Sequence, residues 1–345
     1  MWACENGHKN VVQLLLDYSG RIELNARDTE GHTAFITACK NGHKDVVKLL
    51  LEHSERIDVN TRSKIGFTGF LYACSSGHKD VVQLLMDQSA IIDLNVRSIA
   101  GKTSLMLACL RERYKDVVQM LLDHPDTDID LNARDNTGMT ALMIAVEGEG
   151  GQGHPFGRFY RYCRGGHKDV VQLLLDNSET IDLNARNNFG ETALLMACMY
   201  GHKNVVQLLL DHSERIELNA RDKEGSTAFM RTCFFGHKDV VKLLLNHSEK
   251  IELNARDDNG RTAFMWACSE GHKDVVKLLL DHSEGIGLNA TDDRGLTAFS
   301  WAHGFGHQDI AELIEEKLNF LRKNSNILTI YVTNHNQDSK IYPKK

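Results

Sequence analysis

The sequence predicts an all-α solenoid, a stack of about nine helix-turn-helix units connected by loops with tight β-turns. Two recurring patterns predict this fold. Lys-Asp-Val-Val followed by a run of leucines appears again and again along the chain. Gly-His pairs precede it at steps of 35 residues, with one longer gap in mid-chain, at Gly7, Gly42, Gly77, Gly166, Gly201, Gly236, Gly271 and Gly306. Because one such unit cannot bury an apolar face alone, stacked neighbours must supply the core.

The second unit shows how its residues dictate two helices. Thr33 is the expected N-cap of a first helix, since its hydroxyl can accept an early backbone N–H. Residues 35–39 place apolar side chains at helical spacing, and Gly42 can adopt the positive φ that ends a helix. Asp45 then puts negative charge in the first turn of a second helix. Residues 46–51 make that helix apolar over most of its circumference, so it must be buried.

A tight turn opens each following unit. It starts with Asp, Asn or Ser and has Gly as its fourth residue, which is the pattern that type I turns favour. The turn recurs at residues 28–31, 63–66, 98–101, 135–138, 187–190, 222–225, 257–260 and 292–295. Turn, helix, helix and loop therefore form the unit.

The whole pattern resembles the ankyrin repeat. It reads Asp-x-x-Gly-x-Thr-Ala-Phe-x-x-Ala-Cys-x-x-Gly-His-x-x-Val-Val-x-Leu-Leu-Leu, then Leu-Asn-Ala, over residues 1 to about 323. The resemblance implies stacked helix pairs with hairpin loops and a concave face that binds proteins, with the histidine bonding adjacent loops. Two features depart from the family. Its Thr-Pro-Leu-His opening reads Thr-Ala-Phe or Thr-Ala-Leu here, as at Thr262, and the unit exceeds the usual length of about 33 residues.

The repeat breaks first at its beginning. Residues 1–27 read as a truncated first repeat, because Met1-Trp2-Ala3-Cys4 aligns with the interior of a first helix at residues 265–268. We therefore expect apolar surface at this end of the stack. We interpret the chain as a fragment, or as one that further repeats precede.

Two more segments leave the pattern. An insertion at about residues 147–164 is rich in glycine and predicts an exposed loop. It contains Gly-x-Gly-x-x-Gly, but no helix opens at the last glycine, so a solvated loop is favoured over a nucleotide site. Residues 324–345 drop the repeat, and we expect a disordered tail, with a strand at 327–332 as the alternative.

Composition excludes several classes of function. The chain has 40 Lys and Arg against 47 Asp and Glu, a net charge of −7, which argues against a nucleic-acid partner. It has no apolar run long enough to span a membrane. Its eight cysteines recur at one place of the repeat, too far apart for disulfides, and indicate buried thiols in a reducing compartment. We expect a cytoplasmic location, with the nucleus as the alternative, and a monomeric stack.

No residue pattern indicates catalysis, a metal or a cofactor. The histidines and cysteines recur once per unit, so each unit supplies one copy rather than a converging set of ligands. No unit provides a unique nucleophile and base, and the sequence therefore predicts that the chain is not an enzyme. The recurring Leu-Asn-Ala asparagines resemble a hydroxylation site of some ankyrin repeats, but loop hydrogen bonding is the favoured role.

Binding can use positions that vary between copies. Aromatic and arginine side chains at such positions suit interface anchors, and the candidates are Tyr72, Tyr200, Arg231, Phe234, Phe235, Trp266, Trp301 and Phe305. The sequence thus predicts a non-catalytic scaffold or adaptor that binds an unidentified partner protein through the concave face, best at residues 190–310. The alternative is the interaction arm of a larger multidomain enzyme, channel or signalling protein.

Overall fold

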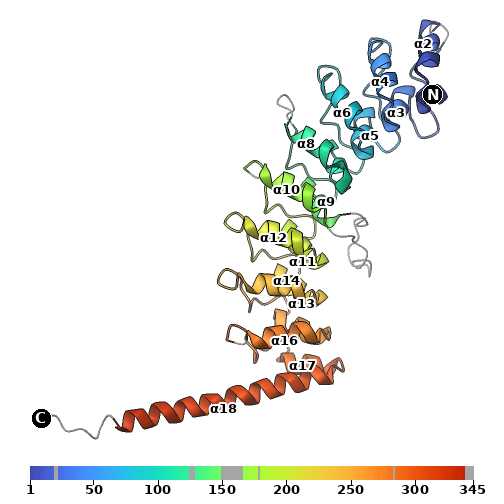
Figure 1. Ribbon diagram of the computed structural model, residues 1–345. Coiled ribbons are helices and arrows are strands. Elements are labelled where there is room, and N and C mark those ends of the chain that lie inside the picture. Colours follow the sequence, from blue (N-terminus) through green and yellow to red (C-terminus); the bar gives the residue numbers. More distant parts are fainter. Residues whose placement is uncertain (19–21, 124–128, 149–165, 178, 283, 339–345) are drawn as a thin grey trace, which may run out of the picture. The chain divides into compact units, whose positions relative to one another are not determined.

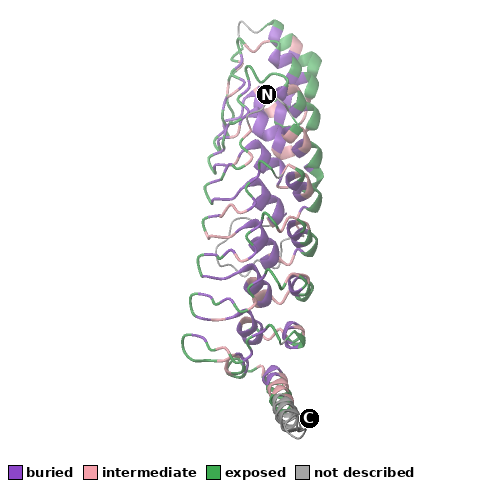
Figure 2. Cartoon of the chain, turned by 90° about the vertical axis from the view of Figure 1, so that its left-hand side faces the viewer, coloured by how far each residue is buried: buried purple, intermediate pink, exposed green. Residues whose placement is uncertain are grey.

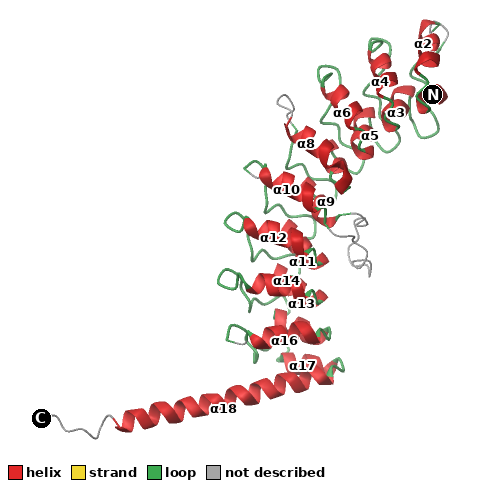
Figure 3. Ribbon diagram, viewed as in Figure 1, coloured by secondary structure: helices red, strands yellow, loops and turns green. Residues whose placement is uncertain are grey.

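The structure, a computed structural model, describes residues 1–18, 22–123, 129–148, 166–177, 179–282 and 284–338, with side chains up to residue 324. The chain divides into two compact units, Met1–Glu217 (unit 1) and Leu218–Lys345 (unit 2). The described residues are helical with loops between the helices (Figure 3). Besides the helices, these residues form two isolated antiparallel bridges, Arg221 with Thr227 and Thr291 with Thr297. The all-α prediction is confirmed.

Unit 1 is built from helix pairs. Its described helices are α1 Trp2–Glu5, α2 Lys9–Asp17, α3 Ala34–Lys40, α4 Lys44–Leu51, α5 Gly69–Ser76, α6 Lys79–Met86, α7 Ser104–Ala108, the 3-10 turn η2 Glu112–Tyr114, α8 Lys115–Asp123, α9 Ala141–Glu147, α10 Lys168–Asp176, α11 Ala193–Tyr200 and α12 Lys203–Asp211.

Like helices pack on like helices in unit 1. The first helices α3, α5 and α7 contact one another in order, as do the second helices α2, α4 and α6 (Figure 1). The first helices are buried over most of their length, whereas the second helices keep one exposed side (Figure 2). The stacked core that the repeat predicts is therefore present.

Unit 2 repeats the arrangement. Its described helices are α13 Ala228–Phe235, α14 Lys238–Leu245, α15 Ala263–Ser269, α16 Lys273–Asp281, α17 Ala298–Gly304 and α18 Gln308–Asp338. The first helices α13, α15 and α17 pack in a row, and α18 closes the stack against α16 and α17. Helix α18 continues past residue 323, where the sequence predicts the stack to end, and its backbone is helical where the alternative expects a strand. The expected disorder of the tail stays a prediction.

The predicted helix signals hold. The Thr33 hydroxyl accepts the backbone N–H of Ile36 at 3.3 Å, and the other described first helices from α5 to α17 begin with the same threonine cap. Gly42 has a φ of +76°. A side chain at Gly42 would collide with the ring of His78 in the next repeat, so this glycine is needed for both its φ and its size.

Side chains from one loop bond the backbone of the next. His78 Nε2 lies 2.9 Å from the carbonyl of Lys40, which agrees with the loop-bonding histidine that the resemblance implies. The Asn60 amide donates to the carbonyl of Ile91 at 2.7 Å and accepts the N–H of Asp93 at 3.0 Å. Equivalent asparagines do the same in other loops, which confirms that they take part in loop hydrogen bonding.

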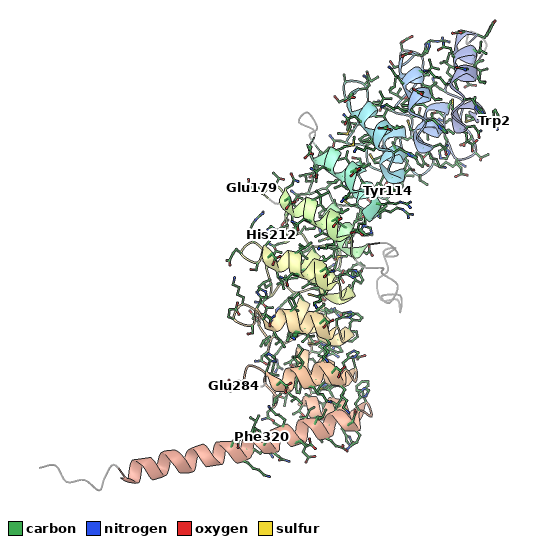
Figure 4. All side chains as sticks on the ribbon, in the orientation of Figure 1. Trp2, Tyr114, Glu179, His212, Glu284 and Phe320 are labelled. Atoms are coloured by element: carbon green, nitrogen blue, oxygen red, sulfur yellow. The ribbon has the colours of Figure 1, made fainter. Side chains whose placement is uncertain are left out.

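The start of the stack exposes apolar side chains. Trp2 is 67% exposed (labelled in Figure 4), and Leu14 is 58% exposed although its counterpart Leu49 in the next repeat is buried. This matches the apolar surface expected there. One repeat has Tyr114 in the place of the loop histidine, and this side chain is buried. The insertion at 147–164 and its glycine motif fall almost wholly on residues 149–165, outside the described residues.

Seven cysteines belong to the described chain, and all are buried free thiols. Burial raises the pKa of the thiols of Cys39, Cys74, Cys109 and Cys268. Cys163 lies outside the described residues. Separately, none of the described helices is both long and apolar enough to cross a membrane.

Candidate functional site

Three turns of unit 2 each carry a carboxylate that serves two purposes. Asp222, Asp257 and Asp292 open the turns before α13, α15 and α17, and all three are buried. In each, Oδ1 accepts backbone N–H groups two and four residues further on, at 2.8–2.9 Å. In each, Oδ2 accepts a side-chain N–H nine residues further on, within the first helix. The turn thereby fixes one side chain of the helix that follows.

That side chain is a tryptophan in two repeats. Trp266 Nε1 donates to Asp257 Oδ2 at 3.1 Å, and Trp301 Nε1 donates to Asp292 Oδ2 at 3.0 Å. Both indoles are half-buried. The N–H is therefore satisfied inside the loop, while part of the ring remains open to solvent, as suits an amphipathic ring at a binding surface.

A guanidinium lies between the two indoles. Arg261 Cζ is 3.7 Å from the ring centroid of Trp266 and 5.8 Å from that of Trp301. Arg261 Nε also donates to Asp257 Oδ2 at 3.2 Å. Contact of a cation with aromatic faces contributes about 0.5–2 kcal/mol, depending on how far it is desolvated. Arg261 thus joins neighbouring repeats into one continuous surface.

Phenylalanines extend the surface on both sides. The Phe234 ring meets the Trp266 ring edge to face at 4.9 Å and the Phe235 ring at 4.8 Å. Phe305 stacks on Trp301 at 5.6 Å and is 59% exposed. We call Phe234, Phe235, Trp266, Trp301 and Phe305 the aromatic face of unit 2. The structure brings these five predicted residues together on consecutive first helices and, for Phe305, at the residue that follows α17.

Arg231 occupies the tryptophan place in α13. Its Nε donates to Asp222 Oδ2 at 2.7 Å, and a second nitrogen reaches Glu224 at 2.7 Å. Burial lowers the pKa of Arg231, but the charges and hydrogen bonds of Asp222 and Glu224 outweigh it and raise the pKa above its usual value. The guanidinium is therefore held in place, charged, beside the aromatic face.

Tyr72 of unit 1 takes a different position. It is 9% exposed, and its hydroxyl lies 2.8 Å from His32 Nε2. The His32 Nδ1 in turn lies 3.1 Å from Asp28, while Lys40 covers the tyrosine ring at 5.5 Å. These contacts occupy Tyr72 inside the stack, so a partner could touch little of it, and we leave it out of the proposal below.

Tyr200 ends α11 in unit 1. Its ring is half-buried and lies 5.6 Å from the ring of His202. Part of the Tyr200 ring is therefore open to solvent.

Sequence reasoning missed the residues that hold the anchors. Asp222, Asp257, Asp292 and Arg261 were not among the candidates. The signal was the constant spacing of nine residues from each turn aspartate to Arg231, Trp266 or Trp301. Among the described residues, no group of three His, Cys, Asp or Glu side chains is placed to hold a metal ion. The chemistry that the face offers is thus apolar and aromatic contact beside fixed charges.

Comparison with protein families gives one result across most of the chain. A family profile described as "Ankyrin repeats (3 copies)" matches residues 1–63, 70–154, 159–257 and 249–325. A comparison with curated proteins finds no match.

Proposed function

The chain belongs to the ankyrin repeat family, and from this premise we propose that it is a non-catalytic adaptor that holds a partner protein on the aromatic face. Ankyrin repeats are generally protein–protein interaction modules and are typically non-catalytic. The finer proposal concerns which surface binds. We assign it to the first helices and turns of unit 2, which belong to the side that the sequence expects to be concave.

One observation supports this assignment above the others. Trp266 and Trp301 are pinned by buried turn carboxylates yet keep part of each ring exposed. A side chain that is already ordered loses little entropy when a partner covers it, which favours affinity. Aromatic residues and arginine are also the types that dominate binding energy at interfaces.

The remaining parts of the proposal follow from the sequence. The partner is a protein rather than a nucleic acid, and the chain acts as a monomer. Buried free thiols support a reducing location, the cytoplasm, with the nucleus as the alternative. An interaction arm of a larger protein would use the same face.

The experiment compares two sets of substitutions in the full chain. Proteins captured by the wild type are quantified against those captured by Phe234→Ala, Phe235→Ala and Trp266→Ala combined. The control combines Tyr18→Ala and Phe320→Ala, which removes two exposed aromatic rings outside the aromatic face (Phe320 is labelled in Figure 4).

The triple variant should capture at least one partner at least tenfold less than the wild type does. Its helicity, measured by circular dichroism, should be unchanged. The control should retain that partner. Equal capture by the wild type and the triple variant would reject this face.

A further inference from the structure

Two neighbouring loop tips of unit 1 differ from the other tips of the chain. Residues 62–67 and 97–102 each carry two cationic side chains and no acidic one. The equivalent six-residue tips all contain at least one Asp or Glu, at 27–32, 134–139, 186–191, 221–226, 256–261 and 291–296.

Serine preserves the turn where the carboxylate is lost. Ser63 and Ser98 stand where most other turns have aspartate. The Ser63 hydroxyl accepts the N–H of Phe67 at 3.2 Å, and the Ser98 hydroxyl accepts that of Lys102 at 3.0 Å. The backbone hydrogen bonds that close the turns are also kept, at 2.9 Å. The change therefore alters the charge of the tips and leaves their shape.

The same two tips expose isoleucines. Ile65 is 50% exposed and Ile99 is 66% exposed. They belong to adjacent tips, because the Ile99 N–H donates to the Ile65 carbonyl at 3.1 Å. Other turns have Glu30 or Glu224 in the place of Ile65, and Asp258 or Asp293 in the place of Ile99. Apolar side chains thus replace acids at exposed points of the turn.

Fixed positive charge surrounds the isoleucines. Arg62 donates to the carbonyl of Arg97, and Arg97 donates to that of Arg134, so each guanidinium is held across the next tip. Within the described chain, no carboxylate lies at ion-pair distance from Arg62, Lys64 or Arg97. By contrast, the equivalent Arg256 pairs with Asp293 at 3.0 Å.

The fourth cation is partly compensated. Lys102 Nζ lies 3.9 Å from Asp135 Oδ2 of the following tip. Three cations and two isoleucines remain for a ligand. We call Arg62, Lys64, Ile65, Arg97 and Ile99 the basic tip patch.

We propose that the basic tip patch binds a short acidic segment of a partner protein that also carries aliphatic side chains. The aliphatic groups contact Ile65 and Ile99, and the carboxylates face Arg62, Lys64 and Arg97. The patch belongs to unit 1 and shares no residue with the aromatic face of unit 2, so it would serve a second segment or a second partner.

Charge favours a short peptide over an extended polyanion. The whole chain has a net charge of −7, so a membrane or a nucleic acid, which spans many tips, meets repulsion beyond the patch. A peptide that touches two tips senses mainly charges within the Debye length of about 8 Å at physiological salt.

A phage-displayed library of random 12-residue peptides, selected on the full chain, tests the proposal. The comparison chain carries Ile65→Glu and Ile99→Asp, residues that other turns of this protein have at the same places, so the turn should fold. Circular dichroism and thermal unfolding verify this. Peptides enriched on the wild type alone should combine Asp or Glu with Leu, Ile or Val.

The best such peptide is then measured by fluorescence anisotropy. Its affinity should fall at least tenfold in the double variant, several-fold in Lys64→Glu, and also with rising salt. Lys223→Glu, at the place equivalent to Lys64 in a tip of unit 2, should bind like the wild type, as should the aromatic-face triple variant.

Two kinds of result would overturn the proposal. One is that no peptide distinguishes the two chains, or that those that do lack acidic residues. The other is that phosphatidylserine vesicles or single-stranded DNA bind the patch while acidic peptides do not.

Discussion

The indole N–H of Trp266 donates to Asp257 Oδ2 at 3.1 Å, while the other oxygen of the same carboxylate closes the turn by accepting the N–H groups of Asn259 and Arg261 at 2.9 Å. One buried carboxylate therefore shapes the loop and orients the aromatic anchor. Because Asp292 and Trp301 repeat the relationship one unit later, the aromatic face is a property of the repeat and not of one loop.

Replacing Asp257 separates these two roles. Asp257→Asn should preserve the turn, since Asn187 accepts the equivalent N–H groups with Oδ1 in its own turn. It removes the charged acceptor of Trp266 and Arg261 and should lower the free energy of unfolding by about 1–2 kcal/mol. Asp257→Ala, which also loses the turn bonds, should cost about 2–4 kcal/mol.

Urea titration followed by tryptophan fluorescence measures both, since two of the three tryptophans, Trp266 and Trp301, belong to unit 2. Asp258→Ala, at an exposed neighbour, is the control and should change stability by less than about 0.5 kcal/mol. Equal losses for Asp257→Asn and Asp258→Ala would contradict the role of Oδ2.

Three glycine-to-alanine changes in unit 2 separate backbone strain from collision. Gly304 lies in α17 with open space around it, so Gly304→Ala should stabilise by roughly 0.5–1 kcal/mol. Gly306 has a φ of +81° and also open space, so Gly306→Ala should cost about 1 kcal/mol from strain alone. Gly236 has a φ of +74°, and a side chain there would strike His272.

Gly236→Ala should therefore be the most damaging, by about 2 kcal/mol or more, because the His272 bond to the Phe234 carbonyl is disturbed as well. Thermal unfolding of the three variants gives the order. If Gly236→Ala lowered stability no more than Gly306→Ala does, the close packing of His272 against Gly236 would be contradicted.

Glu147, at the end of α9, should make unit 1 sensitive to pH. Burial raises the pKa of Glu147 to about 7; Lys102 opposes the rise, whereas Glu191 and Asp135 add to it. Since the folded pKa lies above the unfolded value, the protonated form favours folding. This stabilisation is complete below about pH 4.5 and is lost as the pH rises through 7.

Glu147→Gln should consequently stabilise the protein at pH 8, by on the order of 1 kcal/mol because the half-buried side chain is still partly hydrated, and have little effect at pH 4. Urea titrations at the two pH values measure this. The exposed Glu179→Gln serves as the control. A Glu147→Gln effect that is the same at both pH values would contradict the account.

The buried thiols should react slowly. In a Cys163→Ser background, the remaining seven cysteines are the buried ones, and burial raises the pKa of most of them, so little thiolate is present at pH 8. Labelling with a disulfide reagent should follow unfolding and finish quickly only in denaturant. Rapid labelling of several thiols in the native protein would contradict their burial in the stacked core.

Local signals in the sequence predicted the elements. Thr33 and Gly42 mark helix ends because capping and positive φ depend on one residue and its near neighbours, and the fixed step carries the result to every repeat. The aromatic candidates were found because they stand at positions that differ between the repeats, whereas the scaffold positions stay nearly constant. Phe234, Trp266 and Trp301 do lie together in unit 2.

Contacts between residues far apart in the sequence could not be predicted from such local signals. Tyr72 aligns with Trp266 when the repeats are superposed. Its hydroxyl, however, is within hydrogen-bond distance of His32, forty residues earlier. The hydrogen bonds from arginine side chains to the next loop tip were missed for the same reason, since Arg62 donates to a carbonyl 35 residues away. Such partners become visible only when the stacking geometry places neighbouring loops side by side.

Site-specific photo-crosslinking tests the central claim most directly. A benzophenone side chain replaces Phe305, the most exposed ring of the aromatic face, and in a matched protein it replaces Phe320 of α18, which is equally exposed. The account predicts that one partner protein crosslinks at position 305, does not crosslink at position 320, and is lost when Phe234→Ala and Trp266→Ala are added. Crosslinking of the same partner at both positions, or at position 305 regardless of those two substitutions, would contradict it.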